Sequence, residues 1–225
     1  RDLVARARTV LGGAPFPKPA RLEPWQERLA AESGIAVRID TPTVDGMHRI
    51  TVAAPDRPSV LATVAGVLLL HRFEVRTAAM ETIGDRAVLV WRVATTYGTP
   101  TGEDVLRDEI VRALDGRSDV AARLAARAAE RPGRVIRHAE PSVAVLPEVS
   151  ADATVLEVRA HDEPGLLYRL AAAIGAAGVT IRSAVVETLG AEAVDVFYLL
   201  DRRGGPLSGE AVSSVRSAAT AALER

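Results

Sequence analysis

Residues 155–200 read VLEVRAHDEPGLLYRLAAAIGAAGVTIRSAVVETLGAEAVDVFYLL, and residues 49–94 repeat the same pattern without a gap. The offset is 106 residues, which is the distance from Asp56 to Asp162. Identical pairs at this offset are Val52/Val158, Ala54/Ala160, Asp56/Asp162, Pro58/Pro164, Leu61/Leu167, Ala65/Ala171, Arg76/Arg182, Ala78/Ala184, Glu81/Glu187, Thr82/Thr188, Gly84/Gly190, Ala87/Ala193, Val88/Val194 and Val90/Val196. A period this long indicates a duplicated domain, because solenoid units repeat every ~20–50 residues.

The composition is that of a globular protein. A chain of 225 residues is long enough for about two domains, which agrees with the repeat. A net charge of −1 and an aromatic content of 4% offer neither a basic surface nor stacking side chains, so we expect no nucleic-acid partner. The absence of cysteine excludes disulfides and thiolate chemistry, and it fits the cytoplasmic location that we expect.

The start of the chain predicts a piece of a longer protein, and its apolar runs predict no membrane-spanning segment. The longest apolar run, 59–70, is shorter than the ~20 residues that span a bilayer. The chain begins at Arg1 without Met or a signal-type segment, so we expect further sequence before it. Within 1–34, residues 1–11 predict the last helix of an upstream helical domain, and the four prolines of 12–24 predict a linker.

Each repeat predicts the order strand, helix, strand, strand, helix. The predicted ranges are 48–54, 58–71, 74–83, 87–95 and 102–114 in the first copy, and 153–160, 164–177, 179–189, 193–200 and 207–223 in the second. This is a ferredoxin-like β-α-β-β-α unit, which needs one more strand to complete its sheet. We therefore expect an α+β fold with one domain at 35–116 and another at 142–225.

Two alternating segments, 35–41 and 142–149, are candidates for the missing strands. We expect them to be shared or exchanged, with 35–41 closing the second sheet and 142–149 closing the first. The intervening residues 117–141 predict a helical spacer. Its Arg/Ala-rich part, 117–131, is interpreted as a solvated helix rather than an RNA-binding patch because acidic residues are interspersed.

The turn between the first predicted strand and helix of the second copy has the features of a ligand loop. Asp162 can accept hydrogen bonds from free amides at the helix start, and Pro164 presets the first-turn dihedral. Gly165 lets a ligand approach bare backbone, and the positive end of the helix suits a carboxylate. The same turn could serve structure alone, but its occurrence in both copies favours a ligand site.

Three motifs carry a resemblance to a known family. They are D-x-P-G-L-L at 162–167, G-V-T-I-R-S-A at 178–184 and V-E-T-L-G-A-E-A-V-D-V-F-Y at 186–198. Together they resemble the ACT domain, a regulatory fold that binds amino acids. More narrowly, residues 25–225 are similar to the C-terminal tandem ACT region of the bifunctional uridylyltransferase/uridylyl-removing enzymes of the PII nitrogen-signalling protein, in their actinobacterial form. The resemblance implies tandem ferredoxin-like (ACT) domains whose antiparallel sheets pack against helices.

That resemblance also implies a function. In this family one domain transfers a nucleotidyl group to PII, an HD-type domain removes it, and the ACT pair senses glutamine. It therefore implies L-glutamine as ligand, PII as a partner of the parent enzyme, self-association between ACT units, and magnesium as the parent's cofactor. For the chain itself we predict no catalytic residue, no cofactor and no metal site. His161 lies in the ligand turn, and His48, His71 and His138 are interpreted as surface or turn residues.

The resemblance assigns site residues by matching positions. The ligand site of the second copy comprises the loop residues Asp162, Glu163, Pro164, Gly165, Leu166 and Leu167 and the strand residues Thr180, Arg182 and Ser183. A weaker site in the first copy comprises Asp56, Arg57, Pro58, Ser59, Val60, Leu61 and Arg76. There Ser59 replaces the glycine, and Glu74 would repel a ligand carboxylate. We therefore predict the second copy as the sensor and the first as its partner.

Two other functions remain open on the sequence. The region could be an interaction module that docks PII or the catalytic domains without a ligand. It could also be the ACT regulatory region of another amino-acid-controlled enzyme, because a fold does not fix a function. The sequence leaves open whether the parent transfers uridylyl or adenylyl groups.

Overall fold

The computed structural model describes residues 22–40, 46–95, 100–130, 140–147 and 149–224. The helix predicted at 1–11 and most of the linker predicted at 12–24 lie outside these residues. Within them, no helix has the length and apolar character needed to cross a bilayer.

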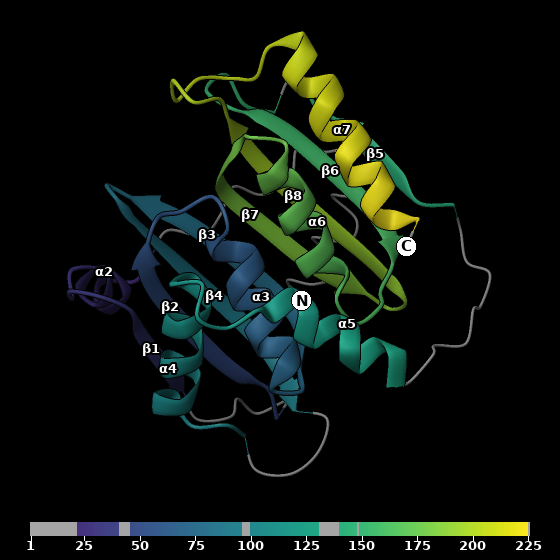
Figure 1. Cartoon of the computed structure of the whole chain (residues 1–225). Helices are drawn as coiled ribbons and strands as arrows, with labels where there is room; N and C mark the ends of the chain where they lie inside the picture. Colours follow the sequence, from purple (N-terminus) through teal and green to yellow (C-terminus); the bar gives the residue numbers. More distant parts are fainter. Residues whose placement is uncertain (1–21, 41–45, 96–99, 131–139, 148, 225) are drawn as a thin grey trace.

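Each repeat folds into a module of four strands and two helices (Figure 1). The first module consists of β1 (Ala36–Asp40), β2 (His48–Pro55), α3 (Val60–Leu70), β3 (Phe73–Ile83), β4 (Arg86–Thr95) and α4 (Glu103–Leu114). The second consists of β5 (Ser142–Val145), β6 (Thr154–His161), α6 (Leu166–Ala176), β7 (Thr180–Leu189), β8 (Glu192–Leu200) and α7 (Gly209–Leu223). Helix α2 (Pro24–Ala30) precedes the first module, and α5 (Val120–Glu130) lies between the two. The elements predicted from residue 35 onward are thus confirmed to within four residues at each end.

All described strands belong to one sheet, in the order β1-β2-β4-β3-β7-β8-β6-β5. Every neighbouring pair is antiparallel, including β3 and β7, which join the modules (Figure 1). The pairing expected between ACT units therefore occurs within this single chain.

The expected exchange of closing strands is wrong. β1 pairs with β2 of its own module, from Ala36 opposite Ala53 to Asp40 opposite Arg49, and β5 pairs with β6 in the same way. Each strand forms a hairpin with the strand that follows it, because consecutive strands are most easily paired through a short connection. The missing edge strand of each ferredoxin-like unit is thus supplied by the residues just before it.

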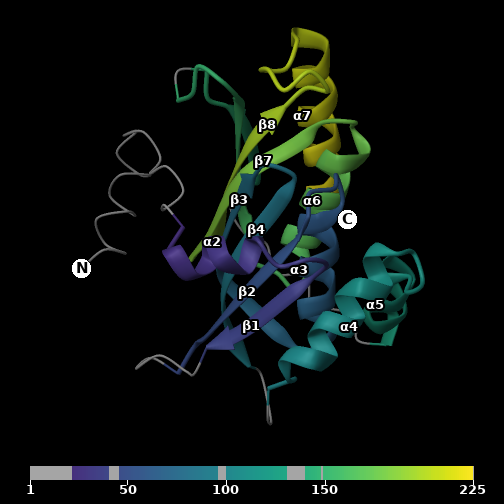
Figure 2. The same ribbon diagram turned by 90° about the vertical axis from the view of Figure 1, so that its left-hand side faces the viewer.

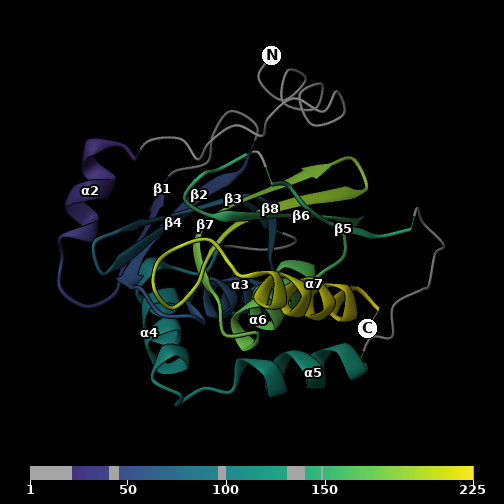
Figure 3. The same cartoon turned by 90° about the horizontal axis from the view of Figure 1, so that it is seen from above.

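The helices of both modules cover one face of the sheet, and α2 covers the other face at the β1 end (Figures 2 and 3). The α3 helix is apolar on nearly all sides, and Val64, Val67 and Leu68 are fully buried. A helix of this kind needs cover all round, and α3 contacts α4, α5 and α6 as well as β3. The two central helices, α3 and α6, therefore bring the modules together above the β3–β7 pair.

Helix α5, expected to be a solvated spacer, packs one of its faces against α3. Val120 is buried against the core, and Arg127 donates hydrogen bonds of 3.0 and 3.1 Å to the carbonyls of Leu69 and Leu70 at the end of α3. Arg123 also forms an ion pair with Glu109 of α4. Helix α5 thus holds the end of α3 in place. This end includes Leu69, which lines the cavity described below.

Candidate ligand-binding cavity between the two modules

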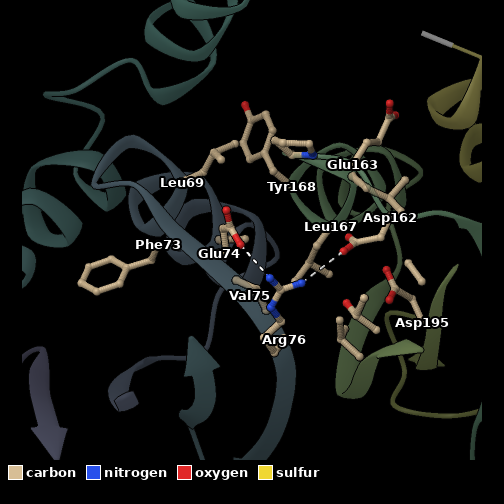
Figure 4. Close-up of a pocket in the computed structure, with 17 residues that line it drawn as sticks. Leu69, Phe73, Glu74, Val75, Arg76, Asp162, Glu163, Leu167, Tyr168 and Asp195 are labelled. Atoms are coloured by element: carbon tan, nitrogen blue, oxygen red, sulfur yellow. Dashed lines mark hydrogen bonds and ion pairs between the residues drawn. The ribbon is translucent and has the colours of Figure 1, made fainter. Parts of the chain in front are cut away.

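A cavity of about 240 Å³ lies where the turn at the start of α6 meets the end of α3 and the start of β3 (Figure 4). The first module contributes Ala65, Leu69, Phe73, Glu74, Val75 and Arg76 to its wall. The second module contributes Asp162, Glu163, Pro164, Gly165, Leu166, Leu167, Tyr168, Val186, Thr188, Ala193 and Asp195. All six predicted loop residues, 162–167, therefore come together at one cavity.

The turn has the shape that its glycine allows. Gly165 adopts φ +89°, a left-handed conformation that side chains other than glycine rarely take, and it forms the N-cap of α6. A Cβ at this position would also lie 3.3 Å from Leu69 Cδ2, across the boundary between the modules. No side chain caps the helix, so the first-turn amides of Leu167 and Tyr168 lack partners within the helix. They are available to a ligand carboxylate.

Asp162 is held in a different way from the one expected. Rather than capping the helix, its side chain hydrogen-bonds Thr188, and it lies 3.9 Å from the guanidinium of Arg76. Burial raises the pKa of Asp162, while the positive charge of Arg76 opposes that rise. The aspartate thus ties the turn to β7 of its own module and to β3 of the other.

The cavity wall carries more negative than positive charge. Among the described residues that line it, Arg76 has the only positive charge, and it forms a 2.7 Å ion pair with Glu74 (Figure 4). Glu163 pairs with Arg169, which lies one turn along α6. A ligand entering this cavity therefore meets one shared guanidinium and several carboxyl groups.

Asp195 of β8 was not among the predicted site residues. Only 1% of its surface is exposed, and neither carboxyl oxygen has a hydrogen-bond partner among the described residues. Burial, reinforced by the charge of Asp162, raises the pKa of Asp195 to about 8. The signal was present in the sequence, since Asp195 is the single charged residue within the apolar run 193–200.

The strand that faces the turn of the second copy is β3 of the first module. Thr180, Arg182 and Ser183, predicted to face the turn of the second copy, do not line this cavity, whereas Glu74, Val75 and Arg76 of β3 do. The cause is the antiparallel pairing of β3 with β7, which points the start of each strand toward the other module. Arg76, assigned to the weaker site, therefore lies at the stronger one, and the charge of Glu74 acts there too.

The turn of the first copy is built differently. Ser59 adopts φ −100°, and with Pro58 it borders a separate hollow of about 530 Å³ against α6 and the α4–α5 connection. Val60 and Leu61 are buried in the core, while Arg57 donates a 3.1 Å hydrogen bond to the carbonyl of Leu114. None of the first-copy loop residues 56–61 lines the 240 Å³ cavity.

Asp56 repeats part of the Asp162 arrangement. The hydroxyl oxygen of Thr82 lies 3.2 Å from Asp56 Oδ2 and 3.2 Å from the carbonyl oxygen of Arg182. The first-copy turn thus also reaches the other module's strand, but through backbone rather than through a guanidinium. The two turns are related in position and differ in chemistry.

Comparison with known proteins agrees with this architecture. Residues 154–216 match the model of the ACT domain family. Over 95% of its length the chain is 40% identical to a bifunctional uridylyltransferase/uridylyl-removing enzyme of Streptomyces coelicolor, and over 87% it is 33% identical to one of Mycobacterium tuberculosis. It spans 31% and 26% of those proteins, respectively.

Among solved structures, an aspartate kinase from Synechocystis aligns with 76% of this chain and 26% of its own, at 14% identity and a TM-score of 0.39. A similarity this low carries no argument about function. The sequence relatives and the domain match identify the family. The chain belongs to the family of the bifunctional uridylyltransferase/uridylyl-removing enzymes, as an ACT-domain region of that family.

Proposed function

We propose that this region senses a free amino acid, L-glutamine, in the cavity between its modules, and that occupancy regulates the enzyme to which it belongs. The observation that carries the proposal is that residues of both modules form the cavity wall. The wall combines the ligand turn of the second module with α3 and β3 of the first. A ligand held there touches both modules and favours the arrangement in which they lie close, which is what a coupling between sites requires.

The size and chemistry of the cavity suit a single amino acid. Its volume of about 240 Å³ is below the roughly 300–1,000 Å³ of pockets that take drug-sized ligands. The free amides at the start of α6 and the guanidinium of Arg76 provide donors for an α-carboxylate. Leu69, Val75 and Leu167 provide an apolar wall for the side chain.

The activity under control is that named for the relatives, the transfer and removal of uridylyl groups. The resemblance implies PII as the protein partner, and we propose the cytoplasm as the location. We assign no residue of this chain to the magnesium expected for the parent enzyme. Within the described part of the chain, no group of three or more His, Asp or Glu side chains is placed to hold a metal ion.

The energies required are modest. A Kd of about 1 mM, in the range of metabolite levels, corresponds to about −4 kcal/mol, which a few hydrogen bonds supply. Allosteric coupling amounts to about 1–3 kcal/mol. A preference of that size for one arrangement of the modules is enough to change the activity of an attached domain.

Calorimetric titration of the 225-residue chain with a panel of amino acids, glutamine first, tests the proposal. Gly165→Val should abolish binding, because its side chain disfavours φ +89° and collides with Leu69. Gly102→Val is the matched control, since Gly102 has φ −71° and open space around it. Thermal unfolding without ligand shows whether each variant is folded.

Binding of glutamine by wild type and by Gly102→Val, but not by folded Gly165→Val, supports the proposal. Equal binding by all three would remove the turn from the site. No heat with any amino acid would reject sensing and favour the ligand-free interaction module.

A further inference from the structure

The carboxyl group of Asp195 forms no hydrogen bond within the described part of the protein. It lies in the cavity wall, it is almost completely buried, and its two carboxyl oxygens have no hydrogen-bond partner among the described residues (Figure 4). A buried polar group without a partner destabilises the folded state, so such groups are rare in proteins. This one calls for a partner from outside the chain.

The repeat shows that the fold does not require an acid at this position. The counterpart of Asp195 at the 106-residue offset is Leu89, which is fully buried in the core of the first module. Both residues occupy the same place in β8 and β4, with the helices above them. A leucine would therefore satisfy the packing, and the aspartate is an addition specific to the module whose turn borders the cavity.

The groups around Asp195 keep it from pairing within the protein. Asp162 of the turn faces it, and Thr188 of β7 is hydrogen-bonded to Asp162. Arg76 of β3 is shared between Glu74 and Asp162, and Glu163 pairs with Arg169 of α6. Burial and the charge of Asp162 raise its pKa to about 8, so near neutral pH the carboxyl group keeps its proton. It then offers one O–H donor and one carbonyl acceptor.

We propose that Asp195 is the specificity residue of this cavity and that it selects a ligand bearing a primary carboxamide. This rests on the proposed function and narrows its ligand class to glutamine-like amino acids. The protonated acid donates its O–H to the amide carbonyl and accepts an N–H from the amide nitrogen, which forms a closed pair of hydrogen bonds. No proton is transferred between Asp195 and the ligand.

The same geometry disfavours the corresponding acid. A ligand carboxylate in place of the amide offers no N–H, and it adds a negative charge beside Asp162 and Glu74. Sites built to hydrogen-bond a substrate group reject analogues that lack it far more strongly than apolar pockets do. An isosteric apolar side chain would leave Asp195 without a partner, as it is in the free protein.

The test is calorimetric titration of the 225-residue chain with L-glutamine, L-glutamate and L-norleucine at pH 6.5, repeated with glutamine at pH 7.5, 8.5 and 9.5. Wild type should bind glutamine at least thirtyfold tighter than the other two, and more weakly as the pH rises above 8. Asp195→Asn keeps a donor and an acceptor and should bind glutamine within about threefold of wild type, without the loss at high pH.

Asp195→Leu, which carries the residue of the first module, should lose at least tenfold in glutamine affinity and most of the discrimination against norleucine. Asp152→Asn, at an exposed site away from the cavity, is the matched control and should bind as wild type does. Thermal unfolding shows that each variant is folded.

Two results would overturn the inference while leaving sensing intact. One is undiminished glutamine binding by Asp195→Leu. The other is a large loss in Asp195→Asn, which would indicate an ionised Asp195 that holds the ligand ammonium. If wild type binds none of these ligands or any other amino acid, the proposed function itself fails.

Discussion

Ala79 of β3 is paired with Val185 of β7, the residue that occupies the same position in the other repeat. The offset between them is the same 106 residues that separate Asp56 from Asp162. An antiparallel pair whose central residues are each other's counterparts has a local two-fold axis between them. This relationship places the start of β3 beside the second turn and the start of β7 beside the first.

The antiparallel pairing of β3 with β7 predicts which arginine contacts a ligand in the cavity. Arg76→Met should weaken glutamine binding at least tenfold, because it removes the positive charge from a wall rich in carboxyl groups. The counterpart Arg182→Met should change binding less than twofold, since Arg182 does not line the cavity. Titration calorimetry of both variants measures the difference, and the reverse order would assign the ligand to the first-copy turn.

Asp195 predicts a pH dependence of stability. Its folded pKa of about 8 lies above its ordinary value of 3.8, so between these values the folded state holds a proton that the unfolded chain has released. The free energy of unfolding of wild type should therefore fall, relative to Asp195→Asn, as pH rises from about 4 to 8. The difference should level off above pH 8 and reach on the order of several kcal/mol.

Urea unfolding of both proteins at pH 5, 6, 7 and 8 checks this dependence. Because Asp162 titrates in both proteins, the difference isolates Asp195. Parallel curves across the whole range would contradict the buried, uncompensated acid.

Glu109 predicts the opposite dependence. Its hydrogen bonds with Arg112 (2.7 Å), Ser118 (3.0 Å) and Arg123 outweigh burial and lower its pKa from 4.5 to about 2. Its contribution is complete above pH 4.5 and is lost as pH falls toward 2. Glu109→Gln should therefore lower the free energy of unfolding by about 1–3 kcal/mol at pH 7 and by less at pH 3.

The matched control for Glu109 is Asp104→Asn, whose partner Arg107 lies one turn away on the exposed side of α4. Exposed pairs of this kind contribute little, so the change should stay below about 0.5 kcal/mol. An equal effect of the two substitutions, by urea unfolding, would argue against a special role for the α4–α5 junction.

Arg72 predicts a stabilising substitution. It follows α3 with φ +64°, where its counterpart Gly178 follows α6 with φ +78°. Left-handed backbone costs a non-glycine residue about 1–2 kcal/mol, part of which is offset by the greater freedom of glycine in the unfolded chain. Arg72→Gly should raise the free energy of unfolding by about 0.5–1 kcal/mol. The reciprocal Gly178→Ala should lower it by about 1 kcal/mol, and a loss of stability in Arg72→Gly would show that its side chain matters more than its backbone.

Much of the fold could be predicted because its signals are local. The strand and helix ranges follow from alternation and helical periodicity, and the turn at Gly165 follows from residue types with fixed dihedral preferences. The exchange of closing strands was predicted wrongly because an alternating segment such as 36–40 does not indicate which strand it pairs with. That choice depends on the short connection to β2.

The sequence predicts the loop of the candidate site but neither the facing strand nor Asp195. The loop 162–167 follows from its own residues, and all six lie at the cavity. The sequence predicts a facing strand from the same copy, because one repeat considered alone does not reveal that its neighbour supplies Glu74 and Arg76. Asp195 is not predicted, since a single acidic residue in an apolar strand indicates a site only when the cavity beside it is known.

The duplication, the order of elements in each module and the glycine turn follow from the amino-acid sequence alone, because each depends on residues that are neighbours along the chain or recur at one offset. The pairing of β3 with β7 into one sheet, and the position of the cavity between the modules, follow from tertiary contacts. The same contacts place Arg76, rather than Arg182, beside the second turn. These depend on contacts between residues as far apart as Thr77 and Glu187, which are fixed by how two apolar surfaces pack and by which strand edges pair.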